Sequence, residues 1–176
     1  MAAGHPNPRT IVVVRHAKAE SSAATDHVRE LTARGRADAK AAGELLSEIL
    51  DPDAETVALV SSATRARQTW DVAAAELDVK IEDRDLDELY EAGGDDVVDL
   101  LALLPDEIEV AIVVGHNPTM EALVHQLDNG DDEDLSAELG ARGLPTAAVA
   151  VLELDGSWSG LEATSCRLVR LEVGRG

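Results

Sequence analysis

The sequence contains no phenylalanine and a single cysteine, and aromatic residues make up only 2% of its 176 residues. A hydrophobic core therefore has to be built from alanine, valine, leucine and isoleucine. Cys166 has no partner for an internal disulfide, which fits a reducing compartment. No run of about 18 apolar residues and no secretory signal pattern is present. We therefore expect a cytoplasmic protein without a membrane-spanning segment.

Basic residues are also scarce, since 15 lysines and arginines stand against 35 aspartates and glutamates, for a formal net charge of -20. A surface this acidic repels nucleic acids and anionic membranes, so neither is expected as a partner. The five histidines show neither HxxxH nor HExxH spacing, so no metal site is expected. Length and composition fit one soluble domain. We assign it to residues 9–176, after a short disordered tail at residues 1–8.

Three aliphatic stretches predict strands that are buried on both faces, as in a parallel sheet. They cover residues 11–14, 56–60 and 110–114. After each strand, apolar residues recur at helical spacing and predict a helix. These helices cover residues 33–50, the stretch from Ala66 to Leu77 and the stretch from Met120 to Leu127. Alternating strands and helices indicate an α/β fold with a mostly parallel sheet.

Local signals refine this pattern. Thr32 and Asn117 are predicted N-caps of the first and third helices, with Pro118 at the first helical position. The weaker signals predict, in chain order, a short strand at 79–81, an acidic connection at 83–94, a helix at 95–104, an acidic loop at 128–134, a strand after Pro145, a hairpin partner near 158–163 and an edge strand at 166–173.

Each of the three strong strands is followed by residues that can bind a phosphate. Arg15 and His16 follow the first, Arg65 lies in the first turn of the helix after the second, and His116 follows the third. Each alone would fit a solvated surface residue or a helix cap. Ligands of open α/β sheets bind outside the carboxyl ends of the strands, so together these residues predict one site. Guanidinium groups match phosphoryl oxygens, and an imidazole can act as nucleophile or donor, so the chemistry needs no metal.

The motifs RHAKAE, LTARGR, SSATRARQT, DELYEA and VVGHNP, in this order, resemble the histidine phosphatase superfamily, and within it the SixA-type phosphohistidine phosphatases. The resemblance implies a single-domain, three-layer αβα sandwich of the phosphoglycerate mutase type. It also implies that His16 is a nucleophile that becomes phosphorylated, without a cofactor. Arg15, Arg65 and His116 would bind the phosphoryl oxygens. The usual RHG is RHA here, and Ser62 stands where many members have proline.

The proton donor is less well defined by the sequence. Many members of the superfamily place a glutamate in the region that matches DELYEA, so Glu88 is the candidate and Glu91 the second choice. An alkyl phosphate needs a general acid for its leaving oxygen. Phosphohistidine depends on one less, because imidazole is a far weaker base. Lys18 and Arg29 would either add positive potential at the rim of the pocket or lie in solvent.

The short loops between the motifs predict a shallow, open pocket, which suits a phosphorylated side chain on a protein. The sequence therefore favours a phosphatase that removes phosphate from phosphohistidine on a protein such as a phosphorelay domain. A small-molecule phosphomonoesterase of the same superfamily is the main alternative, with a small phosphate ester as its partner. A non-catalytic phosphate-binding module is a third interpretation. A phosphomutase is disfavoured, because the chain is short for holding and reorienting a bisphosphate intermediate.

Overall fold

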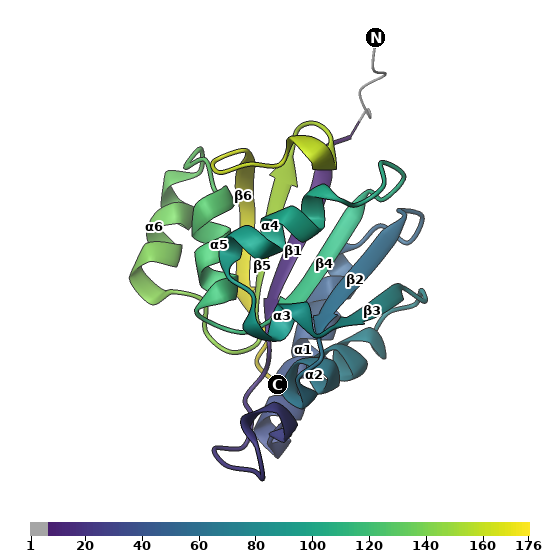
Figure 1. Ribbon diagram of the computed structural model, residues 1–176, viewed down its shortest axis with the longest axis vertical. Helices are drawn as coiled ribbons and strands as arrows, with labels where there is room; N and C mark the ends of the chain where they lie inside the picture. Colours follow the sequence, from purple (N-terminus) through teal and green to yellow (C-terminus); the bar gives the residue numbers. More distant parts are fainter. Residues whose placement is uncertain (1–6) are drawn as a thin grey trace.

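A computed structural model describes residues 7–176 of the chain. Of the predicted tail at residues 1–8, residues 1–6 lie outside the described residues. A six-stranded sheet forms the centre, with the strand order β3-β2-β4-β1-β5-β6 (Figure 1). The strands are β1 (Arg9–Arg15), β2 (Thr56–Ser61), β3 (Glu82–Leu86), β4 (Val110–Gly115), β5 (Ala148–Leu154) and β6 (Cys166–Val173).

The helices cover both faces of this sheet. The α-helices are α1 (Ala33–Ile49), α2 (Thr64–Ala74), α3 (Glu88–Glu91), α4 (Gly94–Ala102), α5 (Thr119–Leu127) and α6 (Glu133–Arg142). Two short 3-10 helices, η1 (Asp26–Val28) and η2 (Trp158–Gly160), complete the set. Helices α1 and α2 lie on one face, and α4, α5 and α6 on the other (Figure 1). Strands β1 to β4 run parallel, and β5 is antiparallel to β1. The predicted three-layer α/β fold is confirmed.

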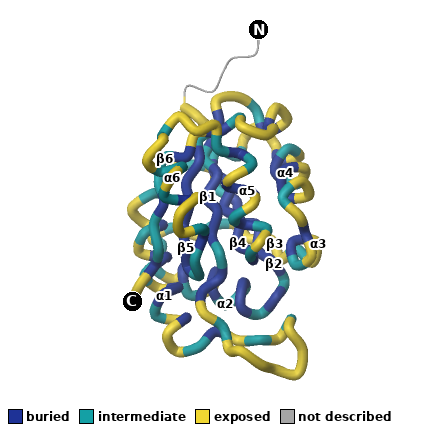
Figure 2. The backbone as a smooth tube through the Cα atoms, turned by 90° about the vertical axis from the view of Figure 1, so that its left-hand side faces the viewer, coloured by how far each residue is buried: buried dark blue, intermediate teal, exposed yellow. Residues whose placement is uncertain are grey.

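Strand β1 shows why its sequence is apolar without interruption. Ile11 and Val13 pack in the core under α4 and α5, whereas Val12 and Val14 pack under α1 and α2 beside Trp70. Successive side chains of a strand point to opposite faces, so a central strand with helices on both sides needs apolar residues at every position. Figure 2 shows these buried strands at the centre of the molecule. No helix in the described part of the chain is long and apolar enough to cross a membrane.

Two glycines allow close packing of α1 against its neighbours. A Cβ atom at Gly35 would lie 2.0 Å from the carbonyl oxygen of Lys18, and one at Gly43 would lie 2.4 Å from that of Ala73. The segment after β1 therefore touches the first turn of α1, and α1 touches α2. Thr32 caps α1 as predicted, because its Oγ1 accepts a hydrogen bond from the Gly35 N–H at 2.9 Å.

The short strand predicted at residues 79–81 is wrong, because the strand β3 begins at Glu82 and continues to Leu86, within the stretch predicted to be a connection. Its side chains are mostly exposed, and it lies at the edge of the sheet, so it lacks an apolar pattern. Asp83 and Asp85 instead form ion pairs with Arg67 of α2, at 2.9 and 3.0 Å. This arginine offsets part of the negative charge of the edge strand.

Three further expectations need correction. The hairpin partner predicted near residues 158–163 is wrong, because this stretch contains η2 and buries Trp158, and the partner of β5 is β6. Part of the acidic loop predicted at 128–134 belongs to α6, which Asp132 caps through the Leu135 N–H. The N-cap of α5 is Pro118 and not Asn117. The edge strand predicted at 166–173 is confirmed.

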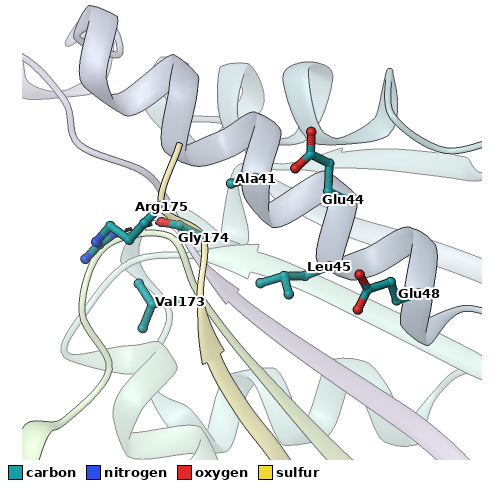
Figure 3. A pocket seen from close by; sticks show the side chains of 7 residues that line it. All are labelled: Ala41, Glu44, Leu45, Glu48, Val173, Gly174 and Arg175. Carbon is teal, nitrogen blue, oxygen red and sulfur yellow. Dashed lines mark hydrogen bonds between the residues drawn. The ribbon is translucent and has the colours of Figure 1, made fainter.

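The end of the chain is fixed on α1. The backbone of Gly174 lies so close to α1 that a Cβ there would be 2.5 Å from the carbonyl oxygen of Asp38. The buried carboxylate of Asp38 accepts hydrogen bonds from Arg34 at 2.9 Å and from the backbone of Gly176 at 3.2 Å. A cavity of about 210 Å³ remains between α1 and this end of the chain (Figure 3). It contains none of the predicted site residues.

Candidate active site

The predicted residues lie at the carboxyl ends of three adjacent parallel strands. Arg15 ends β1 and is paired in register with Gly115, the last residue of β4. His16 and His116 come directly after these two residues, and their ring centroids are 5.3 Å apart. Arg65 lies in the first turn of α2, which follows β2. The structure therefore brings the four residues to one edge of the sheet.

His16 is 8% exposed, and a hydrogen bond to the backbone fixes the orientation of its ring. Its Nδ1 lies 2.7 Å from the carbonyl oxygen of Ala17. A carbonyl only accepts hydrogen bonds, so Nδ1 carries the proton and Nε2 keeps its lone pair. Burial and, to a smaller extent, the Arg65 and Arg15 cations outweigh the hydrogen bond to Ala17 and lower the pKa of His16 to about 4. The imidazole is therefore neutral at pH 7, with a nucleophilic nitrogen at Nε2.

His116 is held by the last residue of β2. The Oγ of the fully buried Ser61 lies 2.6 Å from Nε2 of His116. Burial lowers the pKa of His116 to about 3, and His16 and Arg65 add to this effect. Its Nδ1 is buried and has no hydrogen-bond partner within the described residues. This nitrogen can bind a group that enters between the two histidines.

The two arginines use few of their donors within the protein. Arg15 donates from Nη1 to the carbonyl oxygen of Leu144 at 2.9 Å. Arg65 donates from Nη1 and Nη2 to the backbone and the carboxylate of Asp26, at 2.9 and 3.1 Å. The Nε atoms of both arginines are buried without a partner in residues 7–176. Because a guanidinium has five N–H donors, most of this capacity is left for an anion.

Four side-chain nitrogens of the described chain are buried without a partner, and three of them belong to this edge of the sheet: Arg15 Nε, Arg65 Nε and His116 Nδ1. Buried polar atoms in folded proteins almost always have a partner, so such a concentration needs an explanation. A tetrahedral oxyanion among these groups would supply the missing acceptors. The site is therefore built for an anion.

Residues of η1, of the segment after it and of α3 lie beside Arg65 and His116. The hydroxyl of Tyr90 donates to Asp26 Oδ2 at 2.6 Å, and its ring meets that of His116 edge-on at 5.8 Å. Arg29 donates from Nε to Asp26 Oδ1 at 2.9 Å. The hydrogen bond from Tyr90, together with the cations of Arg65 and Arg29, lowers the pKa of Asp26 to about 2. Asp26 is therefore an anion that ties the 3-10 helix η1 to the site.

Thr69 connects the backbone just after His16 with the backbone of Arg65. Its Oγ1 accepts from the Ala17 N–H at 3.0 Å and donates to the carbonyl oxygen of Arg65 at 2.7 Å. The turn after His16 is thereby fixed to α2. Sequence reasoning missed this residue, together with Ser61 and Asp26. A polar residue at the end of an apolar strand, as at Ser61, is the one signal that could have drawn attention to them.

The predicted proton donors lie on α3, the helix that also carries Tyr90. Glu88 begins α3, is exposed, and lines a groove between α3 and α4 together with Glu91. In the described part of the chain, neither carboxylate forms a hydrogen bond or ion pair with His16 or His116. Lys18 is exposed, whereas its carbonyl oxygen accepts from the Thr32 N–H at 3.0 Å. Residues 7–176 contain no group of three or more His, Cys, Asp or Glu residues that could hold a metal ion.

Comparison with known proteins agrees with this geometry. The model of the histidine phosphatase superfamily (branch 1) matches residues 11–98, half of the chain. An uncharacterised protein of Mycobacterium leprae is 34% identical over 150 residues, which cover 85% of this chain and 89% of that protein. A candidate phosphohistidine phosphatase SixA from Nakamurella multipartitia superposes with a TM-score of 0.81 at 32% identity, covering 94% of this chain and 98% of that one.

A phosphoglycerate mutase from Plasmodium falciparum shares the fold at 18% identity, with a TM-score of 0.58 and coverage of 97% of this chain and 94% of that one. The family model and the SixA-like structure support a phosphatase function. By its matched family model, its relatives and its fold, the chain belongs to the histidine phosphatase superfamily.

Proposed function

We propose that the protein removes phosphate from phosphohistidine on a protein, through a covalent phosphohistidine on His16. The observation that carries the proposal is the set of three unpartnered buried nitrogens around a neutral imidazole. A phosphoryl group held by Arg15, Arg65 and His116 would lie where Nε2 of His16 can attack it. Positioning and charge stabilisation account for most of the catalysis of phosphoryl transfer.

In the first step, Nε2 of His16 attacks the phosphorus, and the bond from phosphorus to the leaving nitrogen breaks. The Nδ1–H of His16 keeps its hydrogen bond to Ala17, which supports the positive charge that develops on the ring. A hydrogen bond from the Ser61 hydroxyl to Nε2 of His116 would place the proton of His116 on Nδ1. That N–H could then donate to a phosphoryl oxygen.

In the second step, water attacks the phosphorus, the bond to Nε2 of His16 breaks, and inorganic phosphate leaves. Neither step requires a metal or cofactor, because the guanidiniums of Arg15 and Arg65 offset the phosphoryl charge. Glu88 stays the predicted proton donor for an ester. Its position in the groove between α3 and α4 favours phosphohistidine as the substrate, because imidazole leaves with less help from an acid than an alkoxide does.

The test is turnover of two substrates by the wild type, by His16→Ala and by His125→Ala. His125 is an exposed histidine of α5 and provides a matched control. The substrates are a phosphorelay domain phosphorylated on histidine and a generic aryl phosphate. We expect the wild type and His125→Ala to cleave phosphohistidine fast and the aryl ester slowly. His16→Ala should have no activity on either substrate.

Other outcomes would replace the proposal. Faster cleavage of esters than of phosphohistidine would make the protein a small-molecule phosphomonoesterase. Turnover that survives in His16→Ala would exclude His16 as the nucleophile. Binding of inorganic phosphate without turnover of either substrate would leave a phosphate-binding module.

A further inference from the structure

An apolar groove lies next to the candidate active site, between α3 and α4. Its volume is about 430 Å³. The lining residues are Asp87, Glu88, Glu91, Ala92, Asp96, Asp99, Leu100 and Leu103. Leu103 is 82% exposed, and the only other large hydrophobic residue exposed in the described chain is Val28, at 45%. An apolar side chain this exposed, at the edge of a groove, is typical of an interaction surface.

The carboxylates around the groove are not neutralised. No lysine or arginine lines it, and only Asp96 has a hydrogen-bond partner in the described chain, the backbone N–H of Gly93 at 2.7 Å. The acidic edge strand β3 differs, because there Arg67 forms ion pairs with Asp83 and Asp85. The groove therefore combines an apolar surface with uncompensated negative charge, and the complementary ligand is both apolar and basic.

Helix α3 connects this groove to the candidate active site. Glu91 lines the groove, and the adjacent Tyr90 reaches the site, where its hydroxyl binds Asp26 and its ring meets His116. Because a helix rises only about 1.5 Å per residue and turns about 100° per residue, the two surfaces lie on neighbouring sides of one helical turn. A protein that presents a phosphorylated side chain to His16 would have its neighbouring surface close to the groove.

We propose that this groove docks a basic amphipathic segment of the phosphorylated substrate protein, with apolar side chains against Leu100 and Leu103 and lysine or arginine side chains against Asp99 and Glu91. The proposal rests on the function proposed above and names the chemistry of the partner. A second copy of this chain is a poor occupant, because its net charge of -20 would face the same carboxylates.

The test uses two phosphohistidine peptides of equal length. One has lysine and leucine around the phosphohistidine, and the other has glutamate and serine at the same positions. Both are given to the wild type and to the double variant Asp99→Lys/Leu103→Ser. We expect the wild type to prefer the basic peptide by about tenfold in kcat/KM and the double variant to lose this preference. The preference should also weaken at high salt.

Two controls separate docking from other effects. Asp134→Lys makes the same charge change as Asp99→Lys at an exposed residue of α6, away from α3 and α4 (Figure 1), and should keep the preference. Turnover of an aryl phosphate should be equal in all variants, because that substrate is too small to reach the groove. A loss of aryl phosphate turnover in the double variant would overturn the inference, because these residues would then act on the active site or the fold.

The remaining outcomes distinguish the two proposals. Equal turnover of both peptides by the wild type would reject the docking groove and leave the phosphatase proposal intact. Absence of phosphohistidine cleavage from either peptide and from the phosphorelay domain would reject the proposed function itself. A wild type that dimerises in sedimentation experiments, and an Asp99→Lys/Leu103→Ser variant that does not, would assign the groove to a second copy and overturn the inference.

Discussion

The two ends of strand β1 each carry an arginine, and the two arginines have different surroundings. Arg9, at the start of the strand, donates to the carbonyl oxygens of Gly156 and Asp106 and pairs with the Asp106 carboxylate at 3.0 Å. Its guanidinium also lies over the ring of Trp158, 5.9 Å from the centroid. Within residues 7–176, the side chain of Arg15, at the other end, has a single hydrogen bond, to the carbonyl oxygen of Leu144.

This difference separates an arginine that stabilises the fold from one that is available to a ligand. Burial lowers the pKa of Arg15, and the nearby Glu121 only partly offsets this effect, so the protein holds a charge that its own groups do not fully compensate. A partly buried charge without full compensation costs stability and is typical of functional sites. Arg9 has its counterion and its aromatic contact within the fold and needs no ligand.

The largest effect expected from this comparison is that of Arg15→Ala on turnover. Loss of a guanidinium that binds the transferring phosphoryl group should lower kcat/KM by about 10³-fold, or about 4 kcal/mol of transition-state stabilisation. The free energy of unfolding should change by less than about 1 kcal/mol, because one hydrogen bond is lost and one desolvated charge is removed. Steady-state kinetics and urea unfolding measure the two quantities. A variant that unfolds more easily but keeps its activity would reverse the assignment.

Arg9→Ala should show the opposite behaviour. The substitution removes the hydrogen bonds to Gly156 and Asp106 and the contact with Trp158, and it leaves a cavity, so we expect a loss of about 3 kcal/mol in unfolding free energy. The kcat/KM should stay at the wild-type value, because Arg9 lies at the amino end of β1 and the site lies at its carboxyl end. Urea unfolding at constant m-value checks the stability. Comparable losses of kcat/KM in Arg9→Ala and Arg15→Ala would remove the contrast.

Sequence reasoning succeeds where burial is complete and fails at the periphery. The strands around Ile11 and Val113 are recognisable because every side chain enters a core, whereas β3 binds Arg67 through exposed carboxylates and shows no apolar period. Helix α6 buries only Leu139, so its apolar pattern is too weak to separate from the acidic loop before it. The predicted N-cap Asn117 differs by one residue, since the N-cap of α5 is Pro118.

The site follows the same division. The positions of Arg15, His16 and His116 at strand ends follow from parallel topology, and the sequence is enough to predict them. Their roles stay predictions until turnover is measured. The partners Ser61 and Asp26 could not be predicted in the same way, because the path of a loop and the tautomer of a histidine depend on tertiary contacts. Neither the path of a loop nor a tautomer produces a periodic pattern in the sequence.

The smallest of the expected effects is on stability as a function of pH, and it again separates the two ends of β1. The pKa of His16 is about 4 in the folded protein and about 6.5 in an unfolded chain. The unfolded chain therefore binds the proton first as the pH falls. The stability that the neutral imidazole contributes is complete above pH 6.5 and is lost progressively between pH 6.5 and about 4. At pH 5 the loss should be about 2 kcal/mol.

Urea unfolding of the wild type, His16→Asn and Arg9→Ala at pH 7, 6 and 5 measures this effect. The wild type should lose about 2 kcal/mol more than His16→Asn between pH 7 and pH 5, because the variant lacks the imidazole that has to be protonated on unfolding. Arg9→Ala should fall in parallel with the wild type from a lower starting value, because an arginine does not titrate in this range. If His16→Asn also ran parallel to the wild type, His16 would not be held neutral by burial. The nucleophile would then require activation from another group in the site.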